Sequence, residues 1–163
     1  RRVLSAGEFL RSYTLDSNVI INLKKQYPRD VFPTFWENLE LLIEQELVCI
    51  CRYVQIELQR GHDDLIVWVK DQHDFVCEPS EEELILASEI SNLYPGWVRE
   101  SENAADPFIV AHAQVNTHVI VSDENHASSH VAPQNQKLPN VANAQGVESI
   151  RLLPFAREMQ WSF

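Results

Sequence analysis

Short apolar segments alternate along this chain with segments whose apolar residues recur at helical spacing. The apolar segments span residues 13–16, 47–51, 75–77, 118–121 and 149–152. Most of them are continuously apolar rather than alternating, which is typical of strands that are buried on both faces of a parallel sheet. Helices between such strands cover both faces of the sheet. The order therefore predicts an α/β domain of three layers, α/β/α, with a short central parallel sheet.

Two of the expected helices carry clear start signals. Pro33 suits the first turn of a helix, where its missing N–H is not needed, and an apolar stripe follows it through Ile43. Ser80 and Glu83 have the spacing of a capping box, and Pro95 lies where that helix is expected to end. A further helix is expected to begin at Asp106, directly before Pro107.

The length of 163 residues fits one domain with a substantial core. We expect a single domain over residues 13–163 and an appended or flexible N-terminal segment over residues 1–12. The longest apolar runs fall short of the ~20 residues that a transmembrane helix needs, and residues 1–10 lack the apolar region of a secretory signal. A cytoplasmic location without membrane attachment is expected.

Acidic residues follow three of the predicted strands, and a fourth acidic position opens a helix. Asp16 ends the first strand, Glu57 lies in the helical turn after the second, and Asp123 and Glu124 follow residues 118–121. Asp106 opens the helix before that last strand. Because the carboxyl ends of parallel strands meet at one edge, these carboxylates are expected to converge there. Their mutual repulsion would raise their pKa values unless Mg²⁺ or Mn²⁺, cations that prefer oxygen ligands, neutralised them.

In order along the chain, these acidic segments resemble the four motifs of PIN domains. The matching runs are residues 15–20, 53–58, 105–113 and 119–124. Residues 137–141 and 148–152 are also similar to one PIN subfamily of uncharacterised function. The resemblance implies a Mg²⁺- or Mn²⁺-dependent endoribonuclease that hydrolyses RNA or single-stranded nucleic acid. The implied catalytic and metal-binding residues are Asp16, Glu57, Asp106, Asp123 and Glu124, supported by Ser17, Asn18 and Ser122.

The fourth acidic position has two candidates in the sequence. Counting from Ser122, the PIN pattern places the acid at Glu124, and Asp123 is the adjacent alternative. A shift of one residue at a strand end reverses the direction of the side chain. Both residues are therefore retained as candidates.

The same resemblance sets the expectations for partners. Many PIN domains are toxins of toxin–antitoxin pairs, so an antitoxin protein is an expected partner beside the RNA substrate, and a homodimer is a further expectation. A PIN-like domain that binds or regulates without catalysis is the alternative. The net charge of −11 favours that alternative, because non-specific binding to nucleic acid rests on Lys and Arg.

Each acid also has a plain structural explanation. Asp106 could serve only as an N-cap, and Glu57 could be a solvated helix residue. Three other acid-based sites fit less well. A dehalogenase-type phosphatase would need an Asp where Asn18 stands, and an adhesion-type loop would need Ser at positions 18 and 20. A receiver-like domain would need a Lys at a strand end.

The three cysteines favour neither disulfides nor zinc. An odd number of cysteines in a chain without a secretory signal argues against a disulfide framework. Cys49 and Cys51 alternate around Ile50, as two small side chains on one face of a strand would. The C-x2-C spacing and the fourth ligand that are typical of zinc sites are missing, so zinc is not expected.

Overall fold

Five parallel strands form the centre of the molecule. A computed structural model describes residues 11–61, 63–128 and 130–162. The strands are β1 (Tyr13–Leu15), β2 (Val48–Cys51), β3 (Val76–Cys77), β4 (Val119–Val121) and β5 (Ser149–Ile150). They lie in the order β3-β2-β1-β4-β5, and each neighbouring pair is parallel. The predicted three-layer α/β fold with a short parallel sheet is confirmed.

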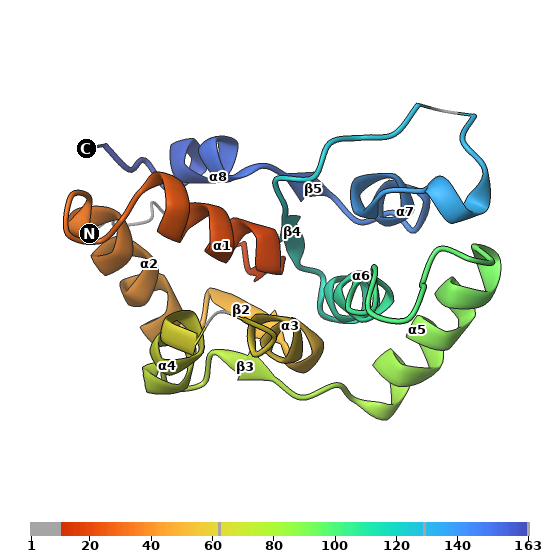
Figure 1. The fold of residues 1–163 in the computed structure, drawn as a ribbon, viewed down its shortest axis with the longest axis horizontal. Helices are drawn as coiled ribbons and strands as arrows, with labels where there is room; N and C mark the ends of the chain where they lie inside the picture. The colour runs from red at the N-terminus through yellow and green to blue at the C-terminus, as the bar shows by residue number, and fades with distance from the viewer. Residues whose placement is uncertain (1–10, 62, 129, 163) are drawn as a thin grey trace, which may run out of the picture.

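The helices form two groups on the two faces of this sheet. The first group is α1 (Ser17–Gln26), α2 (Pro33–Glu44), α3 (Arg52–Leu58), α4 (Asp63–Asp71) and α8 (Leu152–Glu158), and the second is α5 (Glu81–Leu93), α6 (Asp106–Asn116) and α7 (Leu138–Ala144). A short 3₁₀ helix, η1 (Pro133–Asn135), precedes α7. Figure 1 shows α1, α2, α4 and α8 in its left half and α5, α6 and α7 in its right half. Right-handed crossovers between parallel strands require this division, because the strand order runs outward to β3 and then back past β1 to β4.

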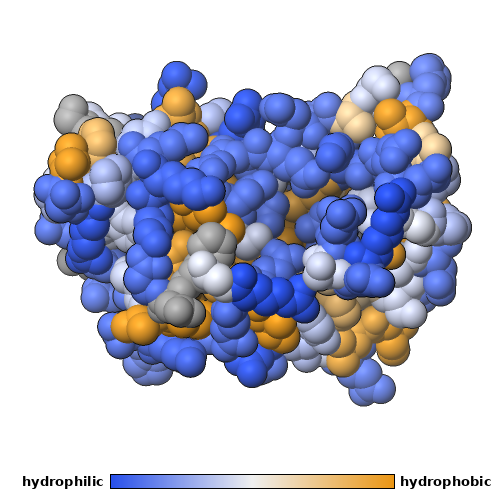
Figure 2. Space-filling model, in the orientation of Figure 1, coloured by the Kyte–Doolittle hydropathy of each residue, from blue (hydrophilic) through white to orange (hydrophobic). Residues whose placement is uncertain are grey.

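The central strands are buried on both faces, as their continuous apolar sequences predict. Every residue of β1, β2 and β4 is buried. An aromatic cluster joins β1 to the C-terminal segment, where the ring of Phe155 lies 4.9 Å from that of Tyr13 and 5.4 Å from that of Trp161. Trp36 and Trp97 are buried in the core. The face drawn in Figure 2 is mostly hydrophilic, with apolar patches along its lower edge. Val67 of α4 and Ile85 of α5 are among the large apolar side chains that are exposed.

The predicted helix starts agree with the structure, but the predicted end of the last strand does not. Pro33 is the first residue of α2, and Ser80 and Glu83 form the full capping box of α5. The last strand ends at Ile150 rather than at residue 152, because Leu152 begins α8. The Leu152 N–H donates to Asp123 Oδ1 over 3.0 Å, a contact across 29 residues of sequence that no local pattern contains.

The chain is already packed against the domain at Arg11. Its guanidinium contacts the carboxylates of Glu148 and Glu158, and the Ser12 carbonyl accepts a hydrogen bond from Val119 N–H. The rest of the appended or flexible segment predicted over residues 1–12 is residues 1–10, which lie outside the described residues. None of the helices that the structure describes has the length and apolar character required to cross a bilayer.

Candidate active site

Asp16 lies at the point where β1 passes into α1. It takes the N-cap position of α1, but its side chain makes no capping bond and accepts a hydrogen bond from a neighbouring hydroxyl instead. Ser122, directly after β4, donates to Asp16 Oδ2 over 2.9 Å. The carboxylate is only 5% exposed. Because β1 and β4 are adjacent and parallel, Ser122 and Asp16 meet at the same carboxyl edge.

Ser17 connects Asp16 to Glu57. Its hydroxyl lies 2.7 Å from Glu57 Oε2 and 3.4 Å from Asp16 Oδ1. A hydroxyl has one proton to donate, so the shorter contact with Glu57 takes it. The Ala105 N–H lies 3.4 Å from the other oxygen of Glu57. Glu57 is thus directed from α3 toward the edge of the sheet, rather than into solvent.

Asp106 is the first residue of α6 and is buried, with 6% of its surface exposed. Ala105 takes the N-cap position, and no side-chain capping bond is formed. Asp106 is therefore not the N-cap that its place before Pro107 would permit. Among the described residues, none donates a hydrogen bond to its carboxylate, and the charges that act on it most are those of Asp16, Glu124 and Glu57.

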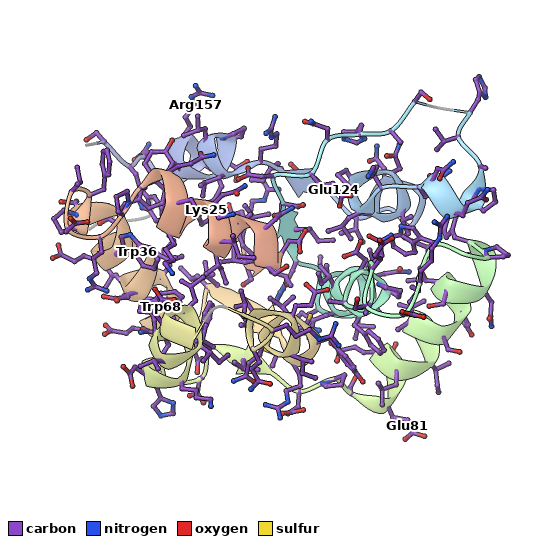
Figure 3. All side chains as sticks on the ribbon, viewed as in Figure 1. Lys25, Trp36, Trp68, Glu81, Glu124 and Arg157 are labelled. Atoms are coloured by element: carbon purple, nitrogen blue, oxygen red, sulfur yellow. The ribbon has the colours of Figure 1, made fainter. Side chains whose placement is uncertain are left out.

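Glu124 and Asp123 point in different directions after β4. Glu124 is half-buried near the centre of the molecule, whereas Glu81 projects outward from α5 (Figure 3). The carboxylate oxygens of Glu124 lie 3.8 Å from Lys137 Nζ and 3.4 Å from Leu138 N. Asp123 instead accepts hydrogen bonds from Asn22 Nδ2 and Leu152 N. Successive side chains at a strand end point in opposite directions, and this alternation separates Asp123 from Glu124.

Hydrogen bonds of Asn18 and Ser122 link the start of α1 to the segment that follows β4. Asn18 Nδ2 donates to Ser122 Oγ over 3.3 Å, and Asn18 Oδ1 accepts from Asp123 N over 3.2 Å. Ser122 Oγ also accepts from Glu124 N over 3.2 Å. Ser122 donates one hydrogen bond and accepts two, so its hydroxyl fixes both Asp16 and the backbone that carries Glu124.

Burial and like charges raise the pKa values of the central acids. Burial raises the pKa of Asp16 to about 7; the Ser122 hydrogen bond opposes this shift, and the charges of Glu57 and Glu124 add to it. Burial also raises the pKa of Asp106 well above its usual value, with further contributions from Asp16, Glu124 and Glu57. The pKa of Glu124 is raised by burial and is partly lowered by Leu138 N–H and Lys137. Such acids carry full negative charge at neutral pH only if a cation balances them.

Lys137 lies close enough to the acidic edge formed by Asp16, Glu57, Asp106 and Glu124 to lower the pKa values of Asp106 and Glu124. Two further basic residues are paired with other acids, Lys24 with Asp64 at 2.5 Å and Arg29 with Glu40 at 2.5 Å. The site therefore offers oxygen ligands in excess of positive charge, which is the donor set that Mg²⁺ and Mn²⁺ prefer.

A second group of polar side chains lies between the sheet and α6, and the sequence did not indicate it. Cys49, Cys77 and His112 offer ligand atoms that all lie within 4.8 Å of one another, the one such group among the described residues. Cys49 and Cys51 do share a face of β2, as predicted, and Cys51 Sγ contacts the Phe108 carbonyl. The ligands come from three elements at separations of 28 and 35 residues, so no short motif could have marked them.

Three comparisons with known proteins bear on this chain. The model of a family described as a domain of unknown function (DUF4411) matches residues 13–163. None of the curated proteins is significantly similar to the chain in sequence. Among solved structures, the fold is similar to VapBC2 from Rickettsia felis bound to a DNA fragment from their promoter. That likeness has a TM-score of 0.56 at 15% identity, and it covers 86% of this chain and 98% of the other. At this identity it supports the PIN-like fold.

Proposed function

This chain belongs to the family described as a domain of unknown function (DUF4411), and from its acidic site we propose that it is a metal-dependent nuclease. The proposed substrate is RNA, cleaved internally by hydrolysis of a phosphodiester bond, with Mg²⁺ or Mn²⁺ as the cofactor. The PIN-like fold and the resemblance of four ordered sequence segments support this choice.

The observation that carries the proposal is the burial of Asp16 and Asp106 beside two further acids. Asp106 is buried and has no hydrogen-bond donor among the described residues, and the charges that act on it most are like charges. A buried carboxylate of this kind destabilises the fold when it is ionised, unless a cation neutralises it. A divalent cation at this edge would relieve both the burial and the repulsion.

We assign the metal-binding roles to Asp16, Glu57, Asp106 and Glu124. When bound there, a divalent cation would lower the pKa of a water molecule and polarise the phosphoryl oxygen. Ser122 and Ser17 hold the carboxylates of Asp16 and Glu57 in place, as hydrogen-bond partners of metal ligands commonly do. Lys137 offers positive charge for a phosphate group beside Glu124. Asp123 is excluded from this set because its carboxylate holds Asn22 and the start of α8.

The test is cleavage of RNA by the purified protein with Mg²⁺ or Mn²⁺, followed by electrophoresis of the products. Asp16→Asn and Glu124→Gln are each expected to lower the cleavage rate by at least ~100-fold, on the order of 3 kcal/mol in the activation barrier. Asp123→Asn is the matched control, because Asn keeps an acceptor for Leu152 N–H, and it is expected to retain activity.

Different outcomes identify the alternatives. Loss of cleavage in Asp123→Asn, with activity kept in Glu124→Gln, would reverse the assignment of the fourth acid. Cleavage that persists in Asp16→Asn would exclude the acidic site as its source. Specific RNA binding without cleavage under any metal would favour the catalytically silent alternative, to which the net charge of −11 lends support.

A protein inhibitor is the partner that a toxin role requires. One structure of similar fold is that of VapBC2, and we extend a partnered arrangement to this chain as part of the proposal. Expression of the wild type without a partner should then slow growth, and Asp16→Asn should not.

A further inference from the structure

Two cysteines and a histidine from separate elements converge on the side of the sheet that faces α5 and α6. Cys49 comes from β2, Cys77 from β3 and His112 from α6. Cys49 Sγ lies 3.4 Å from His112 Nε2. In a tetrahedral zinc site, the usual bond lengths place a sulfur and a nitrogen ligand about 3.6 Å apart. The pair is therefore already at the separation that coordination to one ion demands.

His112 is oriented by a buried carboxylate on its other side. Its Nδ1 contacts Glu83 Oε1, which leaves Nε2 to face Cys49. Glu83 is only 3% exposed and also accepts hydrogen bonds from Asn116 Nδ2 over 2.8 Å and from Ser80 N over 2.5 Å. Metal-ligating histidines commonly donate their second ring nitrogen to a carboxylate in this way, which fixes the tautomer and the ring orientation.

A fourth possible ligand atom lies beside the group. His118 Nδ1 is 3.9 Å from Cys49 Sγ, and the rings of His112 and His118 are 5.1 Å apart. Thr14 Oγ1 lies 2.9 Å from the same Nδ1. Cys77 and His118 are both only half-buried, so the group is not sealed from solvent.

We propose that Cys49, Cys77 and His112 form a Zn²⁺ site, separate from the acidic edge and selective for thiolate-binding metals. Two thiols and one imidazole form a Cys₂His set of protein ligands, and the fourth position is left to His118 or water. Binding of Zn²⁺ releases the protons still held by the two thiols as the two Zn–S bonds form. No carboxylate coordinates directly, which distinguishes this donor set from the oxygen ligands around Asp106.

Such an ion would tie β2 and β3 to α6. Asp106 and His112 lie six residues apart on α6, about 9 Å along the helix axis. Fixing His112 against the sheet therefore also fixes the helix that carries Asp106. The site would act on stability and on the position of α6, and it does not depend on the proposed nuclease activity.

The test is titration of the reduced, metal-free full chain with Co²⁺, which reports thiolate ligation through a sulfur-to-cobalt charge-transfer absorption. A band that saturates at one equivalent and is displaced by Zn²⁺ is expected. Cys49→Ser and Cys77→Ser should remove it, and Glu83→Gln should weaken Zn²⁺ affinity by about 10–100-fold. Gln is also accepted at this position of a capping box, so α5 should keep its N-terminal cap in this variant. A loss of Zn²⁺ affinity would then come from the changed contact with His112 and not from a destabilised α5.

Cys51→Ser and Asp16→Asn are the matched controls and should both keep the band. Because the buried Ser variants could unfold, the wild type provides a second readout: one equivalent of Zn²⁺ should raise its Tm, and a chelator should reverse the rise. Absence of a charge-transfer band and of any Zn²⁺-dependent Tm shift would overturn the proposal. A band lost in Cys51→Ser but kept in Cys77→Ser, or a Cys49–Cys77 disulfide in place of metal binding, would also overturn it.

Discussion

At the scale of single residues, the buried carboxylates of the acidic edge conflict with folding in the absence of metal. Asp16 has a pKa of about 7 in the folded chain, mainly because burial disfavours its charged form, against about 3.8 in the unfolded chain. Between these two values the folded state binds more protons than the unfolded state. Stability must therefore fall as pH rises through this window.

We predict that Asp16→Asn stabilises the metal-free protein at pH 8 and has little effect at pH 4. Asn keeps an acceptor for Ser122 and removes the buried charge, so the gain should be on the order of 1–3 kcal/mol at pH 8. Denaturant unfolding in a chelator at both pH values measures it. Asp30→Asn, at an exposed acid, is the control and should show no such change. A destabilised Asp16→Asn at pH 8 would contradict the conclusion that burial of the ionised carboxylate costs stability.

The two acids after β4 also show what a sequence pattern leaves open at this scale. The motif placed an acid at position 123 or 124, and only side-chain direction separates the two. Asp123 is turned toward Leu152 and Asn22, which lie on elements 29 residues later and 101 residues earlier. No local sequence pattern indicates partners so far away in the chain, so the sequence alone could not decide between Asp123 and Glu124.

At the scale of helices and strands, local signals predicted the elements well where the cause is local. The start of α2 at Pro33 and the capping box of α5 depend on neighbouring residues, and both are as expected. The last strand was predicted to run to residue 152, but α8 begins there, where Leu152 N–H contacts the distant Asp123. The Cys49, Cys77 and His112 group depends on three elements meeting, and no sequence pattern links its members.

The capping box of α5 yields a prediction at the scale of an element. Ser80→Ala removes the acceptor for Glu83 N–H, and we expect it to lower the free energy of unfolding by about 1 kcal/mol. Ser91→Ala is the matched control within α5, because that hydroxyl only donates back to the Ala87 carbonyl inside the helix. It should change stability by less than about 0.5 kcal/mol. Equal losses in the two variants would show that the cap contributes no more than an ordinary helix contact.

At the scale of the whole molecule, two effects of cations on stability overlap. The chain has 24 acidic and 13 basic residues, so any salt stabilises the folded state by screening repulsion. A specific site adds stabilisation that depends on the identity of the cation and on its concentration relative to Kd. A rise of Tm in Mg²⁺ is therefore informative only against NaCl of matched ionic strength.

We predict that Mn²⁺ or Mg²⁺ raises the Tm of the wild type beyond the rise in matched NaCl. At a hundred-fold excess over Kd the added stability should be about 2.7 kcal/mol. In the double variant Asp16→Asn with Asp106→Asn, the extra rise should vanish while the rise in NaCl remains, because the variant changes the net charge from −11 to −9 and leaves the general repulsion largely intact. Calorimetric titration of the same two proteins gives the Kd directly. A divalent effect that persists in the double variant would place the cations outside the acidic edge and remove the main support for a metal-dependent activity.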